Sequence, residues 1–124
     1  MPENIENNNE EKEKIATIAM QIVIAAGDAR NYIMEAMDDV SENDYDKANE
    51  KLEKAKDKLR QAHIYQTEVV QSEAAGTKYE YSLLFTHAQD TVMTICTELN
   101  LAKKIILLYQ KVESRICALE KSIG

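Results

Sequence analysis

The sequence has few of the residues that interrupt helices. Its 124 residues include three glycines, one proline, six tyrosines, one phenylalanine and no tryptophan. Such a composition argues against a loop-rich or many-stranded fold, and the abundance of Ala, Glu, Lys, Ile and Leu favours long helices. The length suits one domain with a core of modest size.

Cysteine is also scarce, with only Cys96 and Cys117 present. They lie on one predicted helix, and at 1.5 Å per residue their spacing puts them roughly 31 Å apart. A disulfide within one chain is therefore excluded, and we expect two reduced, partly buried thiols. No CxxC pair occurs and there are only two histidines, so a cysteine–histidine metal site is not expected either.

Basic residues are fewer than acidic ones, and the formal net charge is −7. This balance argues against binding to nucleic acid and to anionic membrane surfaces. Residues 1–14 do not resemble a secretory signal, and the longest apolar stretch, 15–26, is shorter than the ~20 residues of a membrane span. We therefore expect a soluble, cytoplasmic protein without membrane insertion.

Apolar residues recur at steps of three and four along most of the chain, which predicts three helices. These run from Ile15 to Val40, from Tyr45 to Val69 and from about Tyr79 to Lys121. Asp44 is the expected N-cap of the second helix, and Gly76 suits the end of that helix. Residues 1–12 are polar and lack periodicity, so we predict a disordered acidic tail followed by a single domain at 13–124.

Short connections force neighbouring helices to run antiparallel, so the predicted fold is an all-α, up-down-up three-helix bundle. The third helix is too apolar for one side of such a bundle, because residues 105–108 are all apolar and point nearly all round its axis. A helix that is apolar on most sides must be covered on most sides. We infer that copies of the chain associate around the third helix, with the charge-rich second helix outermost.

One face of the third helix is polar in the middle and apolar at both ends. His87, Asp90, Thr91 and Thr94 share that face at 100° per residue. A neutral imidazole can accept a phosphoryl group or act as a general base near pH 7. For a single histidine in a helical stripe, a structural role with a carbonyl or carboxylate partner is the more common alternative. No GxSxG, GxGxxG or GxxxxGK[ST] motif occurs. The face continues through apolar residues on either side: Leu83, Leu84, Leu101, Ala102, Ile105, Leu108, Val112, Ile116 and Leu119.

Other residues that interrupt the apolar pattern are more consistent with structural roles. Gly27 inside the first helix suggests close helix packing, with Asp28 and Arg30 solvated. His63 is expected to be a buried, hydrogen-bonded histidine on the inner side of the second helix. Four methionines are expected to fill the core: Met20, Met34, Met37 and Met93.

Three segments together resemble a known family. They are AGDAR (26–30), AHIYQTEVVQSEAAG (62–76) and SLLFTHAQDTVM (82–93), in order and with both turns in place. The family is the IIA component of the lactose/cellobiose class of the bacterial phosphoenolpyruvate-dependent sugar phosphotransferase system (PTS). The resemblance spans about residues 13–112.

The resemblance implies a homotrimer of three-helix subunits. It implies that His87 accepts a phosphoryl group from phospho-HPr and passes it to a cysteine of the cognate IIB component, from which it reaches the sugar. Gln89 matches a family glutamine near that histidine. Asp90 matches an aspartate that gathers with its two symmetry mates around a metal ion, usually Mg²⁺.

One departure from the family pattern concerns Thr91. The family usually has a second histidine at this position, whereas a threonine hydroxyl cannot carry positive charge. This change leaves open a non-catalytic helical trimer that acts as a regulator or scaffold. A metal-dependent hydrolase built on Asp90 is a weaker alternative, because no second cluster of metal ligands accompanies it. The sequence does not distinguish lactose, cellobiose, chitobiose or similar disaccharides.

Overall fold

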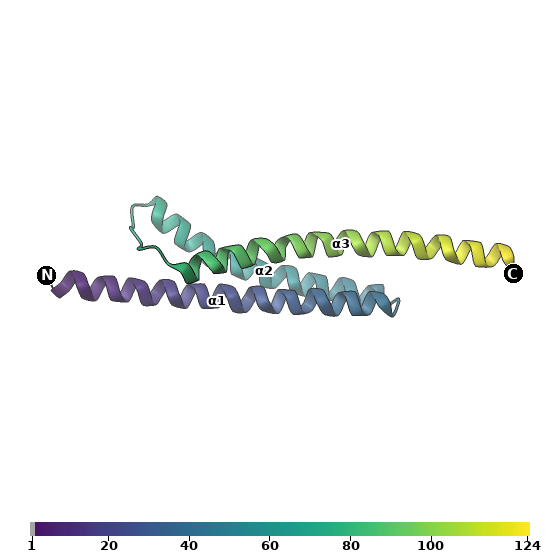
Figure 1. Ribbon diagram of the computed structural model, residues 1–124, viewed down its shortest axis with the longest axis horizontal. Helices are drawn as coiled ribbons and strands as arrows, with labels where there is room; N and C mark the ends of the chain where they lie inside the picture. The colour runs from purple at the N-terminus through teal and green to yellow at the C-terminus, as the bar shows by residue number, and fades with distance from the viewer. Residues whose placement is uncertain (1) are drawn as a thin grey trace.

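The computed structural model describes the backbone of residues 2–124 and the side chains of residues 9–124. It contains three helices, α1 (Pro2–Ser41), α2 (Tyr45–Ala74) and α3 (Leu83–Ile123), and no strand occurs within residues 2–124. Figure 1 shows the chain turning at one end between α1 and α2 and at the other end between α2 and α3. The expected all-α class with three helices is confirmed.

The first helix is longer than the sequence predicts. Residues 2–12, for which we expect a disordered tail, form the first turns of α1; residue 1 lies outside the described residues. The local sequence permits this extension, because Pro2 suits the first turn of a helix and residues 10–14 are all Glu or Lys, which are good helix formers.

Side chains and one glycine define the helix ends. The Asp44 carboxylate accepts a hydrogen bond from the backbone N–H of Lys47 at 3.1 Å, so the expected N-cap of α2 is confirmed. Gly76 follows α2 with φ of 109°, a conformation that favours glycine. The Ser82 hydroxyl accepts from the Phe85 N–H, which starts α3 four residues later than predicted.

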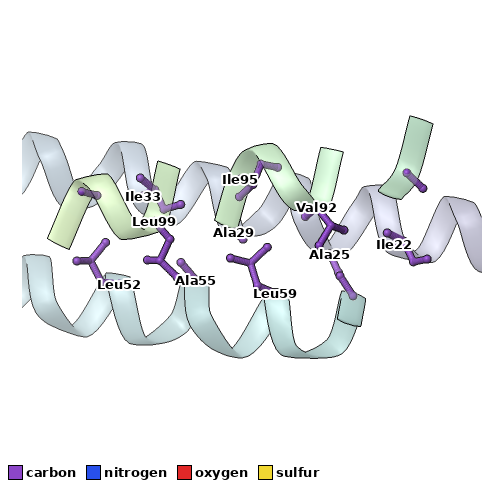
Figure 2. Packing of buried hydrophobic residues seen from close by; sticks show 14 of the residues in the cluster. Ile22, Ala25, Ala29, Ile33, Leu52, Ala55, Leu59, Val92, Ile95 and Leu99 are labelled. Carbon is purple, nitrogen blue, oxygen red and sulfur yellow. The ribbon is translucent and has the colours of Figure 1, made fainter. Parts of the chain in front are cut away.

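Alanines line the helix contacts and let the backbones approach closely. Figure 2 shows this packing, in which α1 contributes to contacts with both other helices. Ile22 and Ile95 are the largest fully buried side chains. The alanines with no exposed surface are Ala19, Ala26, Ala29, Ala36, Ala48, Ala55, Ala62 and Ala88.

The last third of α3 extends beyond the turn between α1 and α2 (Figure 1). Ile106 is the last buried residue of the chain. Tyr45 at the start of α2 supports this extension, because its hydroxyl donates a hydrogen bond to the Glu113 carboxylate and its ring lies 6.3 Å from that of Tyr109. Beyond these contacts the apolar side chains of α3 are exposed.

Three expectations about packing are wrong for the single chain. An added Cβ on Gly27 would meet no atom within 4 Å, so close packing does not explain this glycine. His63 is exposed, because the buried side of α2 is formed by residues such as Leu59 and Ala62. Met20, Met34 and Met93 are about half exposed or more, and only Met37 packs partly against the core.

No helix within residues 2–124 is long and apolar enough to cross a membrane.

Candidate functional site

His87 lies one turn into α3 and points away from the core. The neighbouring residue Ala88 is fully buried, whereas His87 is exposed. Among residues 9–124, no hydrogen bond or ion pair engages the His87 side chain. The single chain therefore does not provide the carbonyl or carboxylate partner that a structural histidine needs.

Asp90 lies one turn after His87 and is exposed as well. Its carboxylate has no hydrogen-bond or ion-pair partner within the described side chains. The structure brings His87 and Asp90 to the same side of α3, as the spacing predicts, without a hydrogen bond between them. A free imidazole and a free carboxylate are thus presented together on an open helix face.

The threonine hydroxyls on this part of α3 bond to the helix backbone. Thr91 Oγ1 donates to the His87 carbonyl at 2.7 Å, and Thr94 Oγ1 donates to the Asp90 carbonyl at 2.9 Å. Such bonds to the carbonyl four residues earlier are common for threonine in helices. A threonine must rotate away from this bond before its proton can reach a phosphoryl oxygen.

Gln89 lies to one side of His87. It is half-buried and lines a cavity of about 200 Å³ under the connection between α2 and α3. Aromatic side chains provide much of the lining, namely those of Tyr79, Tyr81 and Phe85. Gln89 is therefore two residues from His87 in sequence, but its side chain lines this cavity whereas that of His87 is exposed.

The face that carries Asp90 continues along α3 as the apolar stripe that the sequence predicts, and this stripe has an 11-residue period. A period of 11 residues over three turns stays close to the 3.6 residues per turn of an α-helix, so the stripe hardly drifts. Its apolar members are between 49% and 85% exposed. A continuous apolar surface of this kind marks an association site. The stripe consists of Asp90, Thr94 and Thr97, then Leu101, Ile105 and Leu108, then Val112, Ile116 and Leu119, and finally Ile123.

A metal ion would need more than one copy of the chain. No group of three or more His, Cys, Asp or Glu side chains able to hold a metal occurs among the described residues. Asp90 offers one free carboxylate, a donor that suits Mg²⁺. The single chain therefore supplies one ligand, and a site would require Asp90 from neighbouring copies.

The AGDAR segment (26–30) of α1 forms ion pairs with both other helices. Arg30, expected to be solvated, donates from Nε and Nη2 to the Glu98 carboxylate at 3.0 and 2.9 Å and so links α1 to α3. This hydrogen bond raises the pKa of Arg30. Asp28 lies 3.7 Å from Lys58 and links α1 to α2. The segment thus adds one ion pair to the contact of α1 with each of the other two helices.

Comparison with known proteins gives consistent matches. The family model described as "PTS system, Lactose/Cellobiose specific IIA subunit" matches residues 17–110. The lichenan-specific phosphotransferase enzyme IIA component of Bacillus subtilis (strain 168) is 42% identical over 104 residues, which is 84% of this chain and 92% of that protein. The PTS lactose-specific EIIA component of Lacticaseibacillus casei is 33% identical, covering 82% of this chain and 91% of that protein.

A solved structure agrees with these relatives. The crystal structure of the PTS cellobiose-specific enzyme IIA from Bacillus anthracis superposes with a TM-score of 0.76 at 41% identity. The match covers 79% of this chain and 90% of that one. With the sequence matches spanning most of the chain and the fold in agreement, the chain belongs to the lactose/cellobiose-specific IIA family of the sugar phosphotransferase system.

Proposed function

We propose that the chain is a cytoplasmic phosphocarrier that uses His87 in the uptake of a disaccharide of the lactose, cellobiose or chitobiose type. The observation that carries the proposal is the exposed, unpartnered imidazole on α3, within the part of the chain that the family model matches. The partners are HPr as phosphoryl donor and the cognate IIB component as acceptor.

The proposed transfer of the phosphoryl group has two steps. A ring nitrogen of neutral His87 attacks the phosphorus of phospho-HPr, and the bond from phosphorus to the donor atom of HPr breaks as the new P–N bond forms. A thiolate of IIB then attacks the same phosphorus, and the P–N bond to His87 breaks. Such transfer depends mainly on positioning, which α3 provides by holding His87 on a rigid helix.

The neighbours of His87 have supporting roles. Gln89 is the proposed supporting residue beside the phosphohistidine. Thr91 and Thr94 can donate to phosphoryl oxygens once their hydroxyls leave the backbone carbonyls. Because Thr91 replaces a chargeable side chain, we expect phosphohistidine at His87 to be less stabilised by positive charge than in relatives with the second histidine.

We further propose a homotrimer in which the 11-residue stripes of three α3 helices face a common axis. Its exposed apolar residues need a partner, and a period of 11/3 residues per turn suits nearly straight helices. Neighbouring copies would then limit the access of water to His87 and slow hydrolysis of its phosphoryl group.

In this trimer three Asp90 carboxylates meet at the axis. They would hold Mg²⁺ or another divalent cation, which would offset the repulsion between three like charges. The role proposed for the ion is structural, since phosphoryl transfer at His87 needs no ligand from Asp90.

Intact-mass measurement after incubation with phosphoenolpyruvate, enzyme I and HPr tests the carrier role. The parent should gain one acid-labile phosphoryl group, and the His87→Ala variant should gain none. The matched control is His63→Ala, because His63 is the other histidine of the chain and is also exposed. Absence of a gain in a folded parent would overturn the proposal and favour the regulator or scaffold alternative suggested by Thr91.

A further inference from the structure

A basic groove lies between α2 and α3, apart from His87. Its volume is about 340 Å³, and it is shallow and largely open to solvent. Lys56, Arg60 and His63 line it from α2, and they are one helical turn apart. Lys103 lines it from α3 together with Asn100 and Cys96.

The charge of this groove is opposite to that of the chain. The protein has 22 acidic and 15 basic residues, yet none of the described residues that line the groove is acidic. Neither Lys56 nor Lys103 forms an ion pair within the described side chains, whereas Lys51 and Lys58 on the same helix α2 pair with acids of α1. Arg60 has only a loose contact with Asp57, at 3.5 Å. Lys56 and Lys103 are therefore available to an anion, and Arg60 becomes available once its contact with Asp57 is released.

The floor of the groove is apolar. Leu59 and Leu99 are almost fully buried and form part of its lining. His63 and Asn100 add groups that hydrogen-bond neutral polar atoms. The groove thus combines cations for a phosphate dianion with a surface for an attached organic part.

Phosphate binding here is compatible with the proposed trimer. On the helical wheel of α3, at 100° per residue, Cys96 and Lys103 lie roughly 150° and 170° from the centre of the apolar stripe. A trimer formed through the stripe leaves this side of α3 away from the common axis.

We propose that this groove binds a small phosphate monoester. Its phosphate group lies between Arg60 and Lys103, with Lys56 beside it, and its organic part lies over Leu59 and Leu99. Lysine and arginine are the usual phosphate ligands of proteins, and Lys56 and Lys103 alone offset the two negative charges of a monoester dianion. The site is separate from His87 and does not depend on the proposed carrier role.

Isothermal titration calorimetry on the 124-residue chain tests this site. Glucose 6-phosphate is the probe, with inorganic phosphate and glucose as comparison ligands, in HEPES buffer at low salt. Saturable binding of glucose 6-phosphate, tighter than that of inorganic phosphate and absent for glucose, is expected. Equal affinity for both phosphates would overturn the monoester assignment, and absence of saturable binding would overturn the site.

Matched variants localise the binding. Lys103→Gln should weaken it about tenfold, because one charge-assisted contact is lost. Lys104→Gln makes the same charge change on the adjacent, exposed residue outside the groove and should change the affinity by less than about twofold. Equal weakening by both variants would show a general charge effect and overturn the site. His87→Ala should bind as the parent does, which separates this test from that of the carrier role.

The two cysteines provide an independent readout. Cys96 lines the groove and Cys117 is exposed elsewhere on α3. Bound glucose 6-phosphate should slow the alkylation of Cys96 by iodoacetamide and leave Cys117 unchanged, as measured by peptide mass spectrometry. Unchanged alkylation of Cys96 at a saturating ligand concentration would place the ligand elsewhere and overturn the proposal.

Discussion

Replacing Leu108 by aspartate should dissociate the proposed trimer. Leu108 belongs to the apolar stripe and is 63% exposed in the single chain. Full burial of a leucine side chain contributes about 1.5–3 kcal/mol, so covering the exposed part contributes about 1–2 kcal/mol per chain and roughly 3–6 kcal/mol per trimer. Three aspartates near the axis add mutual repulsion. A loss of about 5 kcal/mol raises the concentration for half-dissociation on the order of 10²-fold.

Sedimentation velocity over a range of protein concentrations measures this change. The matched control is Leu107→Asp, because Leu107 is 53% exposed and lies 100° round the helix from the stripe residue. The parent and the Leu107→Asp variant should sediment as trimers at concentrations where the Leu108→Asp variant is monomeric. If Leu108→Asp keeps the parent's oligomeric state, or if both variants dissociate alike, the assignment of the stripe to the axis is wrong.

Three further predictions concern stability. Arg30→Ala should lower the free energy of unfolding in urea by about 1 kcal/mol, since its bidentate pair with Glu98 is half-exposed; no decrease would show that the pair does not stabilise the α1–α3 contact. Burial of the phenol and its hydrogen bond to Glu113 raise the pKa of Tyr45 to about 12. The stabilisation that comes from this raised pKa is fully present below pH 10 and is lost as the pH rises toward 12. The free energy of unfolding of the Tyr45→Phe variant should therefore decrease less over this pH range than that of the parent. An identical decrease in both proteins would refute this role of Tyr45. Gly27→Ala should stabilise the chain by about 0.5–1 kcal/mol in thermal unfolding, because the added methyl has open space; destabilisation would show that another copy covers it.

Local sequence signals predicted the three helices and the capping residues of α2. The recurrence of apolar residues indicated the buried sides of α1 and α2, and Asp44 and Gly76 marked the ends of α2 by side-chain capping and by positive φ. The same spacing placed His87 and Asp90 on one side of α3. These features depend on contacts within a few residues, which a single sequence encodes directly.

Features that depend on the packing of whole helices were predicted less well. His63 has apolar neighbours in sequence, but its side of α2 does not contact α1, so it is exposed. Residues 2–12 lack apolar periodicity, yet they form the first turns of α1, where Glu10, Glu11 and Lys12 are good helix formers. The basic groove brings together residues about 40 positions apart, on α2 and α3, and their joint lining becomes apparent only in the fold.

Phosphoryl transfer from the chain to its cognate IIB component tests the carrier role most directly. The chain is first phosphorylated through enzyme I and HPr, separated from them and mixed with IIB, and the intact masses of both proteins are followed with time. The account predicts that the phosphoryl group leaves the parent and appears on IIB, and that His87→Ala delivers none. A phosphoryl group that stays on the parent while IIB remains unmodified, or equal delivery by His87→Ala, would contradict it.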